Sequence, residues 1–271
     1  MTWLIMIVYG FIAALGQILP VSAAAHDRFL SFMFNFEPNQ PLMQLHIHFA
    51  VFATVLFVYR NKVGHIYQEN KFQSSRRQSD EAALLDGKVV MFMLVPAALG
   101  LLISRLFGDP SGSLPSMVIM LVLSGTLLYI PHFLPSGNRN SSHMSPLEAI
   151  VYGLCAGISV IPGLSWIGSI LSLGSLRGCS RTYLLDMALL LLLPLMLLQI
   201  VIDLIAVLLA GFAMLTWVYW LQCLAAGLAA FLATSLAIGA MRFLSVNRGF
   251  TMFAYFNWGL GIFGFVLYLM I

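Results

Sequence analysis

The stretch YGFIAALGQILPVSAAAH, from Tyr9 to His26, decides the fold. It begins as an apolar helix, is interrupted at Gly16 and Pro20, and becomes polar towards its end. It is too apolar for a surface loop and too interrupted for a simple membrane span. A broken helix at membrane depth frees backbone N–H and C=O groups that lipid cannot satisfy, so such a break persists only inside the protein or beside a wet cavity. We therefore expect a re-entrant hairpin here, with a proline-kinked span as the alternative.

The composition places the chain in a membrane. Of its 271 residues, 61% are hydrophobic and only 8% are charged, whereas a soluble domain carries about 25% charged residues. Long apolar runs begin near Val89, Met117, Leu184, Trp217 and Phe250. Each approaches or exceeds the ~20 residues that cross a bilayer as a helix, and none alternates like a barrel strand. The sequence predicts an all-α integral membrane protein.

The opening stretch recurs in the second half of the chain. YGLCAGISVIPGLSWIG, from Tyr152, also starts with Tyr-Gly and small apolar residues, and it reaches Pro162 shortly before Ser165. Three apolar spans follow each interrupted stretch. Two halves of similar plan indicate a duplicated membrane fold. We predict one membrane domain, 1–271, that contains two repeats, 1–135 and 146–271. Each repeat begins with a re-entrant hairpin, at 2–34 and at 146–176.

The basic residues predict that the two halves are inverted. Three spans is an odd number, so hairpins that each enter and leave on one face would turn the second half upside down. With Arg60–Lys88 in the cytoplasm, only Arg28 and Arg105 lie outside. The cytoplasmic side then collects Arg60, Lys62, Lys71, Arg76, Arg77, Lys88, Arg139, Arg177, Arg181, Arg242 and Arg248. We expect the first hairpin on the outer face, the second on the inner face, and both chain ends outside.

The two interrupted stretches resemble the signature motifs of the undecaprenyl-diphosphate phosphatase family of the bacitracin-resistance type. AALGQILPVSAAAH (Ala13–His26) lies over a family motif that reads roughly E-G-x-T-E-F-L-P-[VI]-S-S-T-G-H. PGLSWIGSI (Pro162–Ile170) lies over P-G-x-S-R-S-G-x-T, and Gly178–Arg181 resembles a later G-[LV]-S-R. The resemblance covers the whole chain. It implies an inverted repeat with two re-entrant hairpins and a polyprenyl diphosphate as the substrate.

The charged residues of these motifs are mostly replaced. Ala13 and Gln17 stand where the family has glutamates, and Trp166 stands where it has an arginine. The resemblance implies that such glutamates hold a divalent metal and act as base. An amide has neither a charge nor a titratable proton, and an indole cannot grip phosphate as a guanidinium does. We therefore expect impaired or absent hydrolysis, with Mg²⁺ or Ca²⁺ as cofactor only if hydrolysis is retained.

The remaining polar groups define the predicted site. His26 is expected to act as an acid or base or to pair with a phosphate oxygen, and Ser22 is a candidate nucleophile if His26 reaches it. Alternatively, His26 is a hydrogen-bonded histidine at the hairpin tip and Ser22 is a helix N-cap. We expect one cavity, open to the outer face and without metal ligands. The predicted substrate-binding residues are Gln17, Ser22, His26, Gly163, Ser165, Trp166 and Gly168.

Other ionisable residues receive structural interpretations. His46 and His48 open the first full span and are expected at the membrane interface, since residues two apart on a helix do not face each other. Asp203 lies inside an apolar run and is expected to pair with a neighbouring helix. Asp27 and Arg28 are expected either at a charged rim of the outer mouth or at a solvated helix end.

These features predict a multi-pass protein of the bacterial inner membrane that binds or acts on a polyprenyl phosphate or diphosphate in the recycling of envelope lipid carriers. A non-catalytic lipid-phosphate transporter (flippase) and a membrane scaffold that keeps only the fold are the alternatives. The expected partners are the polyprenyl lipid and membrane lipids, and a homodimer is compatible with this view. The chain shows no P-loop, zinc signature or nucleic-acid-binding patch.

Overall fold

A computed structural model describes residues 3–34, 40–71, 78–107, 114–135, 137–211, 216–247 and 249–270. In this part of the chain, helices are the regular elements, and the residue pair Arg139–Cys179 forms an isolated β-bridge. Within these described ranges, six helices are long and apolar enough to cross a membrane. The predicted all-α, multi-pass membrane fold is confirmed.

The same order of helices occurs in each half of the chain. Two helices that form a hairpin are followed by three helices that are long and apolar enough to span a membrane, the first-half α5 being so only together with the 3₁₀ turn that continues it. In the first half these are α1 (Trp3–Ile18), α2 (Ala23–Phe34), α3 (Pro41–Lys71), α4 (Gln78–Phe107) and α5 (Leu114–Tyr129), with a 3₁₀ turn at Ile130–Phe133. In the second half they are α6 (Pro146–Ile158), α7 (Trp166–Leu176), α8 (Arg181–Ala210), α9 (Trp217–Asn247) and α10 (Thr251–Met270). The repeat boundaries at 1–135 and 146–271 stay a prediction.

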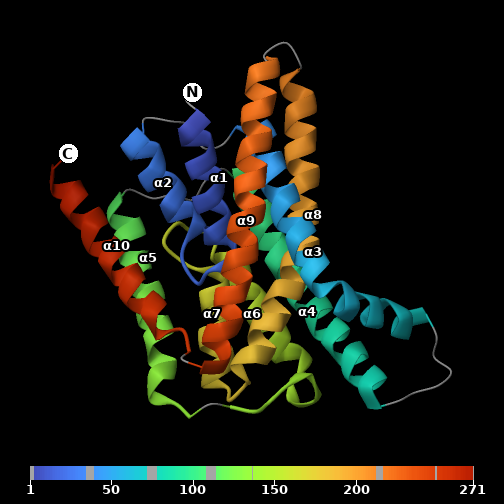
Figure 1. Ribbon diagram of the computed structural model, residues 1–271. Coiled ribbons are helices and arrows are strands. Elements are labelled where there is room, and N and C mark those ends of the chain that lie inside the picture. Colours follow the sequence, from blue (N-terminus) through green and yellow to red (C-terminus); the bar gives the residue numbers. More distant parts are fainter. Residues whose placement is uncertain are drawn as a thin grey trace.

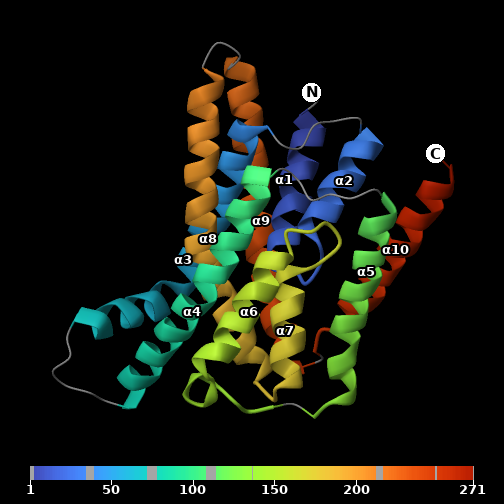
Figure 2. The same ribbon diagram turned by 180° about the vertical axis from the view of Figure 1, so that it is seen from behind.

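The two short hairpins reach the centre of the molecule from opposite sides (Figure 1). Helix α1 runs inward from the side of the N-terminus and α2 returns to that side, whereas α6 and α7 enter from the other side. Figure 2 shows the tips of both hairpins meeting between the long helices. Both chain ends lie on one side, and the last turns of α3 and the first turns of α4 lie on the other. This arrangement matches the expected inversion.

The hydrophilic stretch Arg60–Lys88, which lies between the first two spans, is formed mainly by the ends of two helices. Helix α3 continues to Lys71 and α4 begins at Gln78, so most of the stretch is helical. Its Lys, Gln and Glu residues are good helix formers, and their polarity does not oppose a helix that projects into water. Lys62 on α3 joins two other helices, because its Nζ lies 3.1 Å from an Asp86 oxygen and 3.2 Å from an Asp186 oxygen.

Glu148 organises the start of the second hairpin. Its carboxylate accepts the backbone N–H of Ser145 at 3.0 Å, and the Ser145 hydroxyl accepts the Glu148 N–H at 3.2 Å, which completes a capping box for α6. The guanidiniums of Arg139 and Arg177 lie 3.2 and 2.9 Å from the same carboxylate. The Ser145 N–H, followed by the Arg139 guanidinium, lowers the pKa of Glu148 from 4.5 to about 2.

We predict that Glu148 makes the stability of the protein acid-sensitive. A depressed folded-state pKa means that the stabilisation is complete above the ordinary value of 4.5 and is lost as the pH falls through about 2. Glu148→Gln should lower the free energy of unfolding by about 1–2 kcal/mol at neutral pH, since it removes the charge from two ion pairs while glutamine keeps the capping box. In detergent, acidification should lower the thermal unfolding temperature of the variant less than that of the wild type. Parallel losses would contradict the assignment.

Candidate functional site

The tips of the two hairpins are joined by a hydrogen bond. The Ser22 hydroxyl accepts the backbone N–H of Gly163 at 2.9 Å and that of Ala25 at 3.3 Å. Ser22 therefore caps the start of α2 and also connects the two halves of the chain. We call the two facing segments, 17–22 and 163–168, the hairpin crossing.

Backbone carbonyls freed by the first break find donors on other elements. The indole N–H of Trp166 donates to the carbonyl oxygen of Gln17 at 3.2 Å. The amide of Asn257 on α10 donates to the carbonyl oxygen of Pro20 at 3.1 Å. The last carbonyls of a helix have no partner within it, and lipid supplies none. The first break is therefore stabilised by the second hairpin and by α10.

The second break depends on α5. Ser165 caps α7 by accepting the Gly168 N–H at 3.0 Å, and its own N–H donates to the Ser124 hydroxyl at 3.3 Å. Gly163 has a φ of +105°, and a Cβ built on it would lie 2.5 Å from the Met117 carbonyl oxygen. Only glycine satisfies both the dihedral angle and the close approach to α5.

His26 lies at the edge of the hairpin crossing. Its Nδ1 is 2.7 Å from the backbone oxygen of Ser22, and its ring stacks on Phe256 with the centroids 5.6 Å apart. The Ser22 hydroxyl is instead occupied by two backbone N–H donors. The geometry does not form the Ser22–His26 nucleophile–base pair considered from the sequence. A catalytic role for either residue stays a prediction.

The predicted substrate-binding residues are gathered, but the two serines do not face an open cavity. Ser22 and Ser165 are 1% and 0% exposed, and each hydroxyl bonds to backbone groups of the protein. Gln17 and Trp166 are only half-buried. The two serine hydroxyls are used in this way because backbone groups freed by a helix break, away from water, need a polar partner within the protein.

Comparison with known proteins agrees with this architecture. Residues 6–263 match the family model described as bacitracin resistance protein BacA. The chain belongs to this family. The match extends from within α1 into α10, and so includes both hairpins and all six long helices.

Relatives in the family carry the name undecaprenyl-diphosphatase. One from Halothermothrix orenii is 25% identical over 253 residues, which cover 93% of both chains. One from Methanobrevibacter smithii is 26% identical over 271 residues, covering 96% of this chain and 95% of the relative. One from Syntrophotalea carbinolica is 28% identical over 185 residues, which cover 66% of this chain and 68% of the relative. The identity is low while the coverage is nearly complete for the first two.

The hairpin crossing does not suit a divalent cation. Within the described ranges, no group of three His, Cys, Asp or Glu side chains is placed to hold a metal. Mg²⁺ and Ca²⁺ prefer carboxylate oxygens, whereas the donors here are hydroxyls, backbone groups, Gln17 and His26.

A second polar network lies between α1, α2 and α3. The half-buried Asp27 accepts the Tyr9 hydroxyl at 3.0 Å, and the Gln44 amide donates to the same Tyr9 oxygen at 2.8 Å. The expectation of a rim or a solvated helix end was therefore wrong for Asp27. A carboxylate inside the membrane is costly unless it is paired, and Tyr9 supplies the nearest hydroxyl.

The pairing expected for Asp203 is confirmed. Its Oδ2 lies 2.6 Å from Nδ1 of His48, and both side chains are buried between α3 and α8. His48 is therefore not an interfacial histidine. His46 keeps its Nδ1 on the Leu42 carbonyl oxygen at 2.8 Å and meets the edge of the Trp220 ring. Neighbouring positions on α3 thus point in different directions, as helical spacing requires.

Sequence reasoning missed two residues that support the hairpin crossing, Ser124 and Asn257. Each is buried in a long apolar helix, at 4% and 0% exposure. Their signal was weak but present, because an isolated polar residue in an apolar span usually faces a polar partner in the protein. Neither belongs to a motif that we compared with the family.

We predict that Gly163→Ala disrupts the hairpin crossing. The added methyl group would meet the Met117 carbonyl oxygen at 2.5 Å in a backbone conformation that alanine disfavours, which should cost about 2–4 kcal/mol. Gly239→Ala is the matched control, since a Cβ there meets nothing within 4 Å and should raise stability by about 0.5–1 kcal/mol. Equal unfolding temperatures of the two variants in detergent would contradict the assignment.

Proposed function

We propose that this protein binds a polyprenyl phosphate or diphosphate in the bacterial cell membrane, with impaired or absent hydrolysis. Membership of the family and the names of the relatives support a polyprenyl diphosphate as the lipid class. The proposed site is the hairpin crossing together with His26. The protein would act in the recycling of lipid carriers for the cell envelope.

One contact carries the proposal of impaired hydrolysis. The Trp166 indole donates to the Gln17 backbone oxygen at 3.2 Å, at the two positions where the family resemblance implies an arginine and a glutamate. Phosphoryl transfer requires cationic groups that neutralise the developing charge and a group that orients the nucleophile. An indole and an amide supply neither. Removing a single group that stabilises developing charge typically costs about 10²–10³ in rate, so both changes together leave little turnover.

Binding of a phosphate group remains supported by the helix ends. Helices α2 and α7 both begin at the hairpin crossing, capped by Ser22 and Ser165. The N-terminus of a helix carries partial positive charge and unpaired N–H groups that attract anions. His26 adds a donor at the edge when its ring is protonated, because Nδ1 already donates to the Ser22 carbonyl oxygen. The hydrogen bonds described for the crossing include no carboxylate that would repel a phosphate.

A lipid-phosphate flippase is the second candidate. The observation that favours it is the approach of the two hairpins from opposite sides to a common contact (Figure 2). Such inverted hairpins allow a central site to be reached from either face in alternation. Movement of the labelled lipid across a vesicle membrane, without phosphate release, would favour the flippase over simple binding.

We expect purified protein in nanodiscs to bind polyprenyl phosphate with negligible release of inorganic phosphate from polyprenyl diphosphate, with or without Mg²⁺ or Ca²⁺. At acidic pH, where His26 is protonated, His26→Ala should weaken lipid binding about 5- to 20-fold, the loss of one charge-assisted hydrogen bond. Binding should also weaken as the pH is raised and His26 loses its proton. Tryptophan fluorescence provides the binding signal and a phosphate assay provides turnover.

The combination Ala13→Glu, Gln17→Glu and Trp166→Arg tests the same proposal in reverse. The triple variant should show metal-dependent hydrolysis if the unmodified protein lacks hydrolysis because these charges are replaced. Chelator-sensitive hydrolysis by the unmodified protein would overturn the proposal. Another carboxylate would then have to serve, and Asp27 and Glu37 are the nearest in sequence, of which Glu37 lies outside the described residues.

A further inference from the structure

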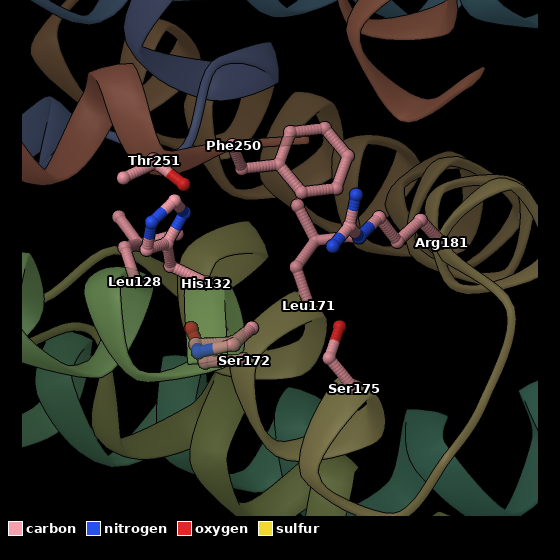
Figure 3. A pocket seen from close by; sticks show the side chains of 9 residues that line it. Leu128, His132, Leu171, Ser172, Ser175, Arg181, Phe250 and Thr251 are labelled. Carbon is pink, nitrogen blue, oxygen red and sulfur yellow. The ribbon is translucent and has the colours of Figure 1, made fainter. Parts of the chain in front are cut away.

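A pocket lies on the side of the molecule opposite the chain ends, between α5, α7, α8 and the start of α10 (Figure 3). It is a small pocket that is partly open to the surface. Its polar lining comes from His132, Ser172, Ser175, Arg181 and Thr251, and none of the described residues that line it is acidic. We call it the Arg181 pocket.

Arg181 brings an uncompensated positive charge into this pocket. Among the described residues, its guanidinium has no hydrogen bond and no ion pair. The nearest carboxylate along α8, Asp186, is engaged by the Tyr59 hydroxyl at 2.7 Å and by Lys62 at 3.2 Å. Gly249 leaves room for the guanidinium, since a Cβ there would lie 2.8 Å from Nη1 of Arg181.

Two serine hydroxyls in the pocket lack partners. The Oγ atoms of Ser172 and Ser175 are buried, and neither has a hydrogen-bond partner among the residues that the structure describes. Ser172 is 1% exposed as a whole residue. A buried hydroxyl without a partner costs about 1–3 kcal/mol, so the pair indicates an acceptor that the protein itself does not supply. Figure 3 shows both serines reaching the pocket from α7 and Arg181 reaching it from α8.

Two helices also begin at the pocket. Arg181 is the first residue of α8 and Thr251 is the first residue of α10. The unpaired N–H groups of a helical first turn add partial positive charge. The guanidinium, the serine hydroxyls and the helix ends therefore all favour an anion with several acceptor oxygens.

We propose that the Arg181 pocket binds a phosphate group, held by the Arg181 guanidinium and the Ser172 and Ser175 hydroxyls. The group is either free inorganic phosphate or the head group of a phosphorylated lipid, which present the same oxygens. The proposal does not rest on the proposed function. Ser165 and Trp166 lie at the other end of α7, roughly 10–15 Å away along the helix.

The test measures binding of inorganic phosphate, and separately of polyprenyl monophosphate in nanodiscs, by calorimetry. His26→Ala is the background for both arms, so that the hairpin crossing contributes little. Saturable binding is expected in at least one arm, and the arm that shows it identifies the source. Arg181→Gln should weaken it about 10- to 100-fold. Arg60→Gln is the matched control, because it removes an exposed arginine from α3 that lies over the Phe57 ring, away from the pocket.

Ser172→Ala with Ser175→Ala keeps the test independent of folding. Removing two hydroxyls that lack partners should leave the stability unchanged or raise it, while phosphate binding should weaken about 5- to 20-fold. Absence of saturable binding in both arms would overturn the proposal. Equal effects of Arg181→Gln and Arg60→Gln would also overturn it, since the bound anion would then respond only to overall charge.

Discussion

The hydrogen bond from the Gly163 N–H to the Ser22 hydroxyl holds together two broken helices at a depth where water and lipid offer no substitute. Each hairpin leaves backbone groups without helical partners, and each supplies what the other lacks. The Trp166 indole donates to the Gln17 carbonyl oxygen, and the Ser22 hydroxyl accepts the Gly163 N–H. The long helices then surround this contact, and Ser124 and Asn257 complete it from α5 and α10.

The same constraint explains how the scaffold persists while charges that the family resemblance implies are missing. The contacts at the hairpin crossing use hydroxyls, backbone groups and an indole, none of which needs a net charge. Replacement of glutamate by Ala13 and Gln17 therefore leaves the structural bonds in place. Turnover depends on charge and binding depends partly on helix ends, so the two properties can separate within one fold.

The sequence predicted the elements better than their contacts. Apolar runs and interrupted stretches located the six long helices and both hairpins, because hydrophobicity and helix breaks are local properties. The partners of Asp27 and His48 depend on which helices become neighbours, and a single sequence does not contain that information. The Arg181 pocket was missed for the same reason, since its lining comes from five separate elements, namely α5, the 3₁₀ turn that follows it, α7, α8 and α10. Sparse family motifs did bring Ser22, Gly163 and Trp166 into one prediction.

The most direct test of the joined hairpins is the hydrogen exchange of the Gly163 amide in nanodiscs, compared between the wild type and Ser22→Ala. Gly163 lies outside any helix, yet its N–H is bonded to a side chain 141 positions away. We predict slow exchange of this amide in the wild type and markedly faster exchange in Ser22→Ala, with the amides of α8 unchanged. Fast exchange in the wild type, or no change at Gly163 in the variant, would contradict the account.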